Sequence, residues 1–250
     1  MAKQDRAVRT RQELIRSAAE AFNRGGFAQS SLTEISTRAG VSNGALHFHF
    51  SNKRALGEAV EAAAARTLHH IMGSCPVGAH SPLQLLVDTS HILAQRLTDD
   101  DVLRAGFRLG NDATWHPRAQ LWMAWRNWVR FMLTLASGEG DLAADVALND
   151  AVAAVTAAVV GFEVLGRADV EWCSRESVTR FWTLMLPRLS ADPAAAGIDA
   201  AGTGASRAVC RDAGDPAPLW DDAGGVDEGT EDSALLAAWS EGESCTVSHR

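Results

Sequence analysis

The sequence predicts an all-α protein with a small basic head, a helical body and an acidic tail. Before residue 190, apolar side chains recur almost everywhere at the three- and four-residue spacing of amphipathic helices. The strict alternation of apolar and polar residues that marks strands is missing. We therefore expect about nine helices: a three-helix head over residues 1–52, a body over 53–190 and a tail over 191–250.

The first predicted helix spans roughly residues 6–24. Its apolar side chains recur at helical spacing and share one face that a core can bury. The pair Gly25-Gly26 follows, and glycine is the usual residue in the left-handed conformation that ends a helix. Phe27 is expected to turn back to the core. The apolar face consists of Leu14, Ile15, Ala18, Ala21 and Phe22.

Two short helices follow, separated by a glycine turn. Ser31 is positioned to cap the first, and Glu34 three residues later is expected to reach back to the cap. Gly40 ends this helix, and the next runs from Ser42 to about His49. Two short helices joined by a tight glycine turn predict a helix-turn-helix.

The body begins with a long helix that starts after Ser51-Asn52 and runs to a break near residues 74–78. Further helices are expected over 82–98, 101–110, 117–137, 148–166 and 170–188. The last two carry apolar stripes, which predict that they pack as a pair and bury against a second copy in a homodimer. These stripes comprise Val152, Val155, Val159 and Phe162, and Val178, Phe181, Trp182, Met185 and Leu189.

Charge is distributed unevenly along the chain. The formal net charge is −8, which taken alone argues against a nucleic-acid partner. Residues 1–57, however, hold nine Lys and Arg against four acids, whereas residues 191–250 hold twelve acids against three arginines. This asymmetry places a nucleic-acid partner at the N-terminal end. The tail, rich in Ala, Gly, Asp, Ser and Pro without periodicity, has the composition of a disordered segment.

Several classes of protein are excluded by what the sequence lacks. The four cysteines show neither metal-ligand nor redox spacing, and His47 and His49, two residues apart on a helix, diverge too far to share a metal. No apolar run is expected to reach the ~20 residues that span a bilayer. We find no nucleophile elbow, phosphate loop or dinucleotide fingerprint. The expectation is a cytoplasmic, nucleoid-associated protein with no catalytic residues, metal or cofactor.

The head closely resembles the tetracycline-repressor (TetR) family. The residues that carry the resemblance are Leu32-Thr33-Glu34-Ile35, Ala39-Gly40-Val41-Ser42 and Gly44-Ala45-Leu46-His47-Phe48-His49-Phe50, followed by Lys53 and Leu56. Two positions differ from the family pattern: Asn43 stands where a lysine or another polar residue is usual, and His47 stands where a tyrosine donates to phosphate. His47 can also donate, but its charge depends on pH near neutrality. The resemblance implies a homodimer bound to pseudo-palindromic double-stranded DNA.

The physical reasons for DNA contact differ along the head. Gly44 and Ala45 make the start of the recognition helix slim, so its backbone can approach the major groove while Ser42 and Asn43 reach base edges or phosphates. Lys53 is expected to contact a phosphate. Core packing is the favoured interpretation of Phe48 and Phe50, and a capping or packing role that of His49. The predicted DNA-binding set is Arg6, Arg9, Arg11, Thr33, Ser42, Asn43, Gly44, Ala45, His47, Phe48, His49 and Lys53.

The body resembles the γ-butyrolactone autoregulator receptors of actinomycetes at two places. These are residues 102–109 and Trp125-Arg126 with the Gly140-Asp141-Leu142 and Asp145-Val146 segments. In those receptors a tryptophan matching Trp125 lies in the ligand pocket, and binding there releases DNA. The resemblance implies a repressor of secondary-metabolite (antibiotic) biosynthesis. A pseudo-receptor that answers an antibiotic or another signal, and a constitutive or activating regulator, stay open as alternatives.

Three tryptophans at three-residue steps, Trp122, Trp125 and Trp128, fall on one face of a helix. Plain core packing is one interpretation. The other is an apolar ligand pocket in which an indole N–H meets a lactone carbonyl. For Trp128, a position facing the dimer partner or solvent stays open as an equal alternative. The residues predicted to line the pocket are Trp125, Trp122, Phe107, Val159 and Phe162.

Overall fold

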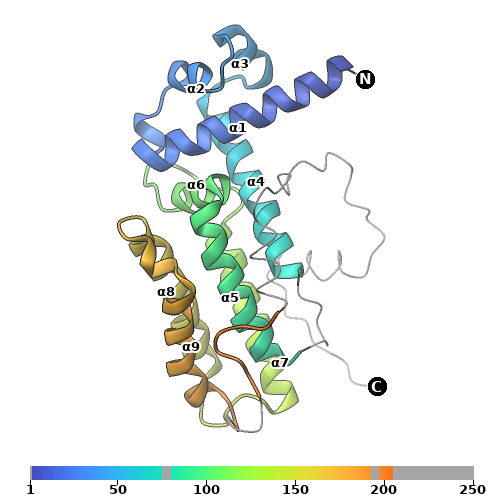
Figure 1. Ribbon diagram of the computed structural model, residues 1–250, viewed down its shortest axis with the longest axis vertical. Helices are drawn as coiled ribbons and strands as arrows, with labels where there is room; N and C mark the ends of the chain where they lie inside the picture. Colours follow the sequence, from blue (N-terminus) through green and yellow to red (C-terminus); the bar gives the residue numbers. More distant parts are fainter. Residues whose placement is uncertain (1, 75–79, 193–196, 205–250) are drawn as a thin grey trace. The chain divides into compact units, whose positions relative to one another are not determined.

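The computed structural model describes residues 2–74, 80–192 and 197–204, which form nine α-helices and one 3-10 turn (Figure 1). Within this part of the chain the only β pairing is an isolated bridge between Leu142 and Ser190, so the all-α prediction is confirmed. The elements are α1 (Ala2–Gln29), α2 (Leu32–Arg38), α3 (Asn43–His49), α4 (Lys53–Gly73), α5 (Pro82–Asp99), α6 (Asp101–Gly110), α7 (Leu121–Glu139), α8 (Leu148–Gly166), η1 (Val170–Cys173) and α9 (Arg175–Leu189).

The described residues form two compact units. The first holds residues up to Leu68 together with Arg96–Trp122, and the second holds His69–Gln95 and the described residues from Met123 onward. The first unit therefore extends beyond the predicted head of residues 1–52, because α6 and most of α4 pack with α1–α3.

The core of the first unit forms where the apolar face of α1 meets α2, α3, α4 and α6. All five apolar residues predicted on α1 are at most 4% exposed. Gly26 has a φ of 76°, which interrupts α1 at the predicted glycine pair, although helical backbone resumes to Gln29. Phe27 packs on Trp115 with ring centroids 4.7 Å apart. The core consists of Leu14, Ile15, Ala18, Ala19, Ala21, Phe22, Ile35, Leu46, Phe50, Leu56, Val60, Ala63, Val102, Ala105, Leu109 and Trp115.

Polar contacts also join α1 to α6. Asn23 Nδ2 donates to the Asp101 side chain at 3.1 Å and to its carbonyl at 2.9 Å. The carboxylate of Asp112 accepts from the Phe27 amide at 3.3 Å, and Arg108 donates to the Asn23 carbonyl. Hydrogen bonds at both ends of the contact fix the register of the two helices as well as their separation.

In the second unit, α8, η1 and α9 form a closely packed group. The rings of Phe162 and Phe181 lie 5.8 Å apart, as expected for a packed helix pair. Helix α9 begins at Arg175, later than the predicted residue 170, because Ser174 N-caps it and accepts from the Ser177 amide at 3.2 Å. Cys173 Sγ donates to the Phe162 carbonyl at 3.2 Å. Trp128 is fully buried within the chain, so the alternative in which it faces solvent does not hold.

Two other expectations need correction. Residues 197–204 bond to α5 and α9, so this segment belongs with the body and not with a tail beginning at 191; residues 205–250 lie outside the described part of the chain. Helix α8 is long and apolar enough to cross a membrane by length and composition, with a mean hydropathy of 1.6 over the tested window. The prediction that no apolar run approaches the length of a membrane span is therefore wrong for α8, because few charged residues interrupt the alanines and valines of this helix.

Candidate nucleic-acid interface

Helices α2 and α3 form the predicted helix-turn-helix, and their own side chains fix its geometry. Ser31 Oγ caps α2 by accepting from the Glu34 amide at 3.1 Å. The carboxylate of Glu34 accepts from Arg24 at 3.2 Å, so the reciprocal bond expected of Glu34 is not the one it makes. In the turn, Gly40 adopts a φ of 66°, a conformation that side chains other than glycine rarely tolerate.

The start of α3 is held in two ways. Ser42 Oγ caps the helix by accepting from the Ala45 amide at 3.2 Å. Asn43 Oδ1 accepts from Ser36 Oγ at 3.0 Å, which ties α3 to α2. Ser42 and Asn43 nevertheless stay exposed, so each has further hydrogen-bonding capacity toward a partner.

One face of α3 is buried and the other is open. Leu46 and Phe50 are at most 3% exposed and belong to the core, whereas Gly44 and His47 are exposed. Phe48 is 81% exposed, so the expectation that it packs in the core is wrong. The cause is its position: Phe48 lies two residues after Leu46, about 200° around the helix. An apolar ring thus stands on the open face of the recognition helix.

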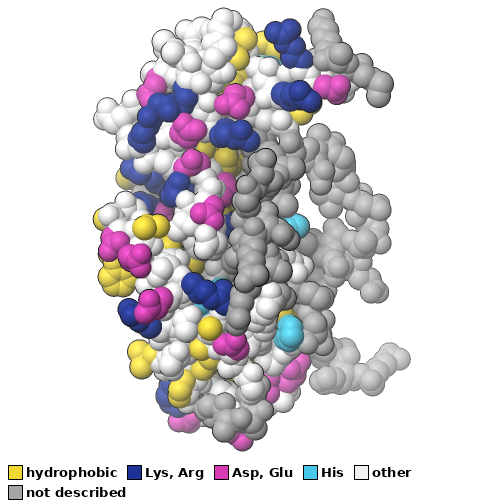
Figure 2. Space-filling model, in the orientation of Figure 1, with side chains coloured by type: hydrophobic (Ala, Val, Ile, Leu, Met, Phe, Trp, Pro, Cys, Tyr) yellow, Lys and Arg dark blue, Asp and Glu magenta, His cyan; other side chains and the backbone are white. Residues whose placement is uncertain are grey.

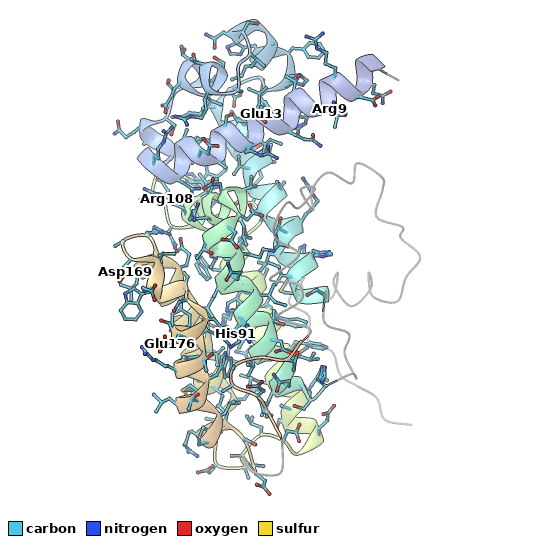
Figure 3. The ribbon with its side chains drawn as sticks, in the orientation of Figure 1. Arg9, Glu13, His91, Arg108, Asp169 and Glu176 are labelled. Carbon is cyan, nitrogen blue, oxygen red and sulfur yellow. The ribbon has the colours of Figure 1, made fainter. Side chains whose placement is uncertain are left out.

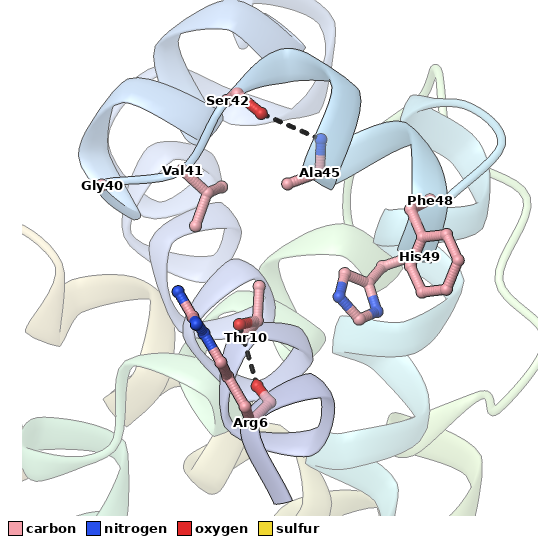
Figure 4. Close-up of a pocket in the computed structure, with 8 residues that line it drawn as sticks. All are labelled: Arg6, Thr10, Gly40, Val41, Ser42, Ala45, Phe48 and His49. Atoms are coloured by element: carbon pink, nitrogen blue, oxygen red, sulfur yellow. Dashed lines mark hydrogen bonds between the residues drawn. The ribbon is translucent and has the colours of Figure 1, made fainter. Parts of the chain in front are cut away.

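A groove of about 430 Å³ runs between α1 and α3 (Figure 4). Arg6 and Thr10 line it from α1, where Thr10 Oγ1 donates to the Arg6 carbonyl at 2.9 Å. His49 borders it from the end of α3. Of the predicted DNA-binding set, the structure brings together five residues here, while Thr10, Gly40 and Val41 were not predicted. The lining is Arg6, Thr10, Gly40, Val41, Ser42, Ala45, Phe48 and His49.

The spacing of Arg6 and Thr10 in the sequence indicates that Thr10 lies at the groove. Thr10 follows Arg6 by four residues, so the two side chains share one face of α1. The position of Gly40 and Val41 follows from the turn, whose backbone path depends on how α2 and α3 pack. Such packing cannot be read from spacing alone.

Basic side chains of the head divide into two groups. Arg24 and Arg38 form ion pairs with Glu34 and Glu20 at 3.2 and 3.0 Å. Arg6 and Arg9 are exposed on α1, and Arg9 is marked in Figure 3, one turn before Glu13. Figure 2 shows Lys and Arg side chains in the region of α1, with Asp and Glu side chains among them. The predicted phosphate-tracking cations are therefore placed on a solvent-facing surface.

Arg11 and His49 lie close enough to influence each other. The Arg11 guanidinium stands 4.7 Å from the centre of the Phe50 ring. Burial, and secondarily the positive charge of Arg11, lowers the pKa of His49 below 6.5. At neutral pH the His49 ring is therefore predominantly uncharged, and a nearby anion would favour its protonation.

Lys53 makes contacts that the sequence did not suggest. Its Nζ donates to the carbonyl oxygens of Phe27, Ala28 and Ser30 at 2.8, 3.1 and 2.9 Å. An ammonium has three donors, so these bonds use its whole capacity and join the end of α1 to the start of α4. The predicted phosphate contact of this side chain stays a prediction, and Thr33 is placed on the exposed side of α2.

The residues predicted to line a ligand pocket fall in both units. In the first, Phe107 and Trp122 are in contact, with ring centroids 4.3 Å apart. In the second, Trp125, Val159 and Phe162 are at most 9% exposed. The indole Nε1 of Trp125 is buried and has no hydrogen-bond partner among the described residues, a feature that it shares with Trp115, Trp122 and Trp182.

Comparison with known proteins identifies the head. The sequence pattern of the bacterial regulatory proteins, tetR family, matches residues 14–60. A shorter likeness is found to the HTH-type transcriptional regulator TtgR of Pseudomonas putida, 39% identical over 56 residues, which cover 22% of this chain and 27% of that protein.

Other similarities extend through the body. The chain is 30% identical over 195 residues to the A-factor receptor protein of Streptomyces griseus, covering 76% of this chain and 67% of that protein. A crystal structure of a gamma-butyrolactone receptor (ArpA-like protein) superposes with a TM-score of 0.70 at 24% identity over 83% of this chain and 99% of that chain. The TetR-family protein CprB of Streptomyces coelicolor, solved with its biological operator sequence, gives 0.64 at 28% identity over 74% and 90%.

The helix-turn-helix geometry, the matched pattern over residues 14–60 and the similarity through most of the body agree. The chain belongs to the tetR family of bacterial regulatory proteins.

Proposed function

We propose that this protein is a transcriptional repressor that binds a pseudo-palindromic operator as a homodimer and leaves it when a small γ-butyrolactone-like effector binds. The observation that carries the proposal is the open face of α3, capped at its start and flanked by the groove toward α1. The similarity to the A-factor receptor protein supports the effector class and a role in antibiotic biosynthesis.

The DNA side of the mechanism follows from the head. Gly44 has no side chain and Ala45 a small one, so the backbone of α3 can approach base edges in the major groove. Ser42 and Asn43, both exposed, supply hydroxyl and amide groups at the same end. Arg6, Arg9 and Arg11 on α1 track phosphates beside the groove, which positions the head without specifying sequence.

Phe48 adds an apolar contact to this surface. Its ring is 81% exposed and borders the same groove as Arg6. Apolar side chains in the major groove contact the methyl group of thymine. We therefore infer that the operator half-site carries a thymine where the Phe48 ring meets it.

The effector side rests on Trp125. A fully buried indole N–H without a partner among the described residues is a donor in need of an acceptor. A lactone carbonyl would satisfy it, while Val159 and Phe162 of the same unit supply apolar surface. Effector binding then favours a body conformation in which the spacing of the two heads no longer matches half-sites about 34 Å apart.

The dimer is expected to form through α8 and α9. Their predicted stripes are largely buried within the chain, yet other apolar residues of the same group stay exposed. Exposed apolar side chains that gather on one group of packed helices, here α8, η1 and α9, mark an interface. This group comprises Val164, Leu165, Val170, Trp172 and Leu184. Burial of α8 against a second copy also accounts for its apolar composition without a membrane, and we place the protein in the cytoplasm with the nucleoid.

The test measures binding of the full chain to its own promoter DNA at fixed salt by fluorescence anisotropy, with and without a γ-butyrolactone extract. Release by the extract from wild type, but not from Trp125→Phe, supports the proposal; phenylalanine keeps an aromatic ring and removes the N–H. Release only by an antibiotic makes the protein a pseudo-receptor. Binding that no effector changes makes it a constitutive regulator, and absence of binding contradicts the proposal.

A further inference from the structure

Helix α5 carries three buried polar side chains on one face of the second unit. Gln84, Asp88 and His91 follow one another at four- and three-residue spacing, and they are 5%, 0% and 3% exposed. A buried carboxylate without donors is costly. The structure therefore has to supply partners for this face, and most of them come from one short segment far along the chain.

That segment is residues 197–204, which cross α5 in the lower part of Figure 1. Gln84 holds Asp199 in both directions: its Oε1 accepts from the Asp199 amide at 2.7 Å and its Nε2 donates to the Asp199 carbonyl at 3.3 Å. Asp88 accepts from the amide and the hydroxyl of Thr203 at 2.7 and 2.8 Å. One residue at each end of the turn is thus bound twice.

The middle of the segment is held by one guanidinium and by one imidazole ring. His91, marked in Figure 3, lies 2.9 Å from the Ala200 carbonyl through its Nε2. Arg175 of α9 donates to the carbonyl oxygens of Ala201 and Gly202. The segment therefore bonds to two helices and links α5 to α9.

The segment also orders itself as a turn. The Gly202 amide donates to the Asp199 carbonyl at 2.9 Å, and the Ala201 amide donates to Asp199 Oδ1 at 2.9 Å. Gly202 has a φ of 75°, a conformation that glycine adopts without strain. A preformed turn loses less conformational freedom on docking than an unstructured chain does.

We propose that the polar surface made by Gln84, Asp88, His91 and Arg175 is a docking site for the chain's own residues 197–204, which act as a latch that clamps α5 to α9. The site recognises polypeptide backbone in a small-residue turn: it binds amides and carbonyls of Asp199, Ala200, Ala201 and Gly202, and reads one side chain, the hydroxyl of Thr203. Closing the latch stabilises the second unit, and opening it frees the two helices from each other.

The latch also fixes where the acidic end of the sequence begins. Residues 205–250 hold ten Asp and Glu against three arginines, and they follow directly after the docked turn. The latch anchors the residues that precede this acidic segment to α5 and α9. This consequence needs neither DNA nor effector, so the latch stands or falls independently of the proposed function.

Hydrogen exchange resolved to single amides tests the latch in the full chain at pH 7.5. We expect the amides of Asp199 and Thr203 to exchange more slowly than in a free peptide of the same sequence. The Thr203 amide bonds to the buried Asp88 carboxylate, so its exchange should be slower by roughly 10- to 100-fold, and that of Asp199, bonded to the neutral Gln84 side chain, by roughly tenfold. Thr203→Val, which keeps shape and removes the hydroxyl, should speed exchange of the Asp199 amide by roughly tenfold.

The matched control is Thr183→Val on α9, because the hydroxyl of Thr183 bonds only to the Thr179 carbonyl of its own helix. This variant should leave exchange at Asp199 unchanged. Combining Asp88→Asn with Thr203→Val should cost less than the two single changes added together, since both act on one contact. Exchange of Asp199 and Thr203 at free-peptide rates, or equal effects of the two valine variants, overturns the latch. If Asp88→Asn fails to fold, the Thr203 and Thr183 pair alone decides.

Discussion

Replacing Lys53 with methionine separates two roles that a lysine can have at the start of α4. Methionine keeps the apolar stem and removes the ammonium, which donates to three carbonyl oxygens at 2.8–3.1 Å. These bonds join the end of α1 to α4, so their loss should loosen the first unit. If Lys53 instead acts mainly on DNA phosphate, stability should be unaffected and DNA binding should weaken.

The expected magnitude follows from the three bonds. Each is partly exposed to solvent, so we assign about 1 kcal/mol to each, the centre of the range for net hydrogen-bond contributions. Lys53→Met should therefore lower the free energy of unfolding by about 3 kcal/mol. If these three carbonyl bonds leave the ammonium no donor for a phosphate, the slope of log affinity against log salt should stay as in wild type.

Arg9→Met is the matched control, since Arg9 is exposed on α1 and belongs to the predicted phosphate-tracking set. It should change the free energy of unfolding by less than about 0.5 kcal/mol and reduce the salt slope by about 0.9, the value for one phosphate. The assays are urea unfolding and operator binding by fluorescence anisotropy from 50 to 200 mM salt. Unchanged stability of Lys53→Met together with a reduced salt slope would refute the reasoning.

Three further predictions concern packing, protonation and the head. Gly106→Ala should destabilise by about 1–3 kcal/mol in urea unfolding, because its new Cβ would lie 2.2 Å from that of Ala64; Gly138→Ala, with open space around it, is the control, and equal effects would contradict the argument. Burial lowers the pKa of His91 below 6.5, so on acidification the unfolded chain takes up this proton at a higher pH than the folded chain does. The free energy of unfolding should therefore be lower at a pH below 6.5 than at pH 7.5, and a rise in the urea midpoint on acidification would count against this. His49, whose pKa is also lowered, should take up a proton beside phosphate, so operator affinity should increase from pH 7.5 to 6.5 in wild type and less in His49→Gln.

The sequence predicted the helices well where a local signal existed. The glycine pair at Gly25-Gly26 marks a real interruption of α1, and Ser31 and Ser42 cap their helices as the spacing suggested. The nine helices of the described residues match the expected number. These features depend on neighbours within a few residues, which is the range over which caps and periodicity act.

Contacts that depend on distant partners were not foreseen. The phosphate contact of Lys53 stays a prediction, but its bonds to carbonyls 23–26 residues earlier had no signal in the spacing. Glu34 was expected to bond its own cap, but Arg24 competes for the carboxylate. In both cases the bonding partner depends on how the end of α1 packs beside α2 and α4. A spacing rule names the groups that are able to bond, and tertiary packing selects the partner.

For the C-terminal segment, too, the sequence prediction failed because the partners lie far away in the chain. Its small residues and acids predict disorder by composition, because they cannot bury enough apolar surface to order themselves. Residues 197–204 are ordered by polar contacts instead, chiefly to Asp88 and Gln84. The complementary signal was on α5, where Gln84, Asp88 and His91 share a face whose polar groups need partners once buried. A polar stripe on an otherwise apolar helix therefore predicts that another segment of the chain, however polar itself, docks there to satisfy it.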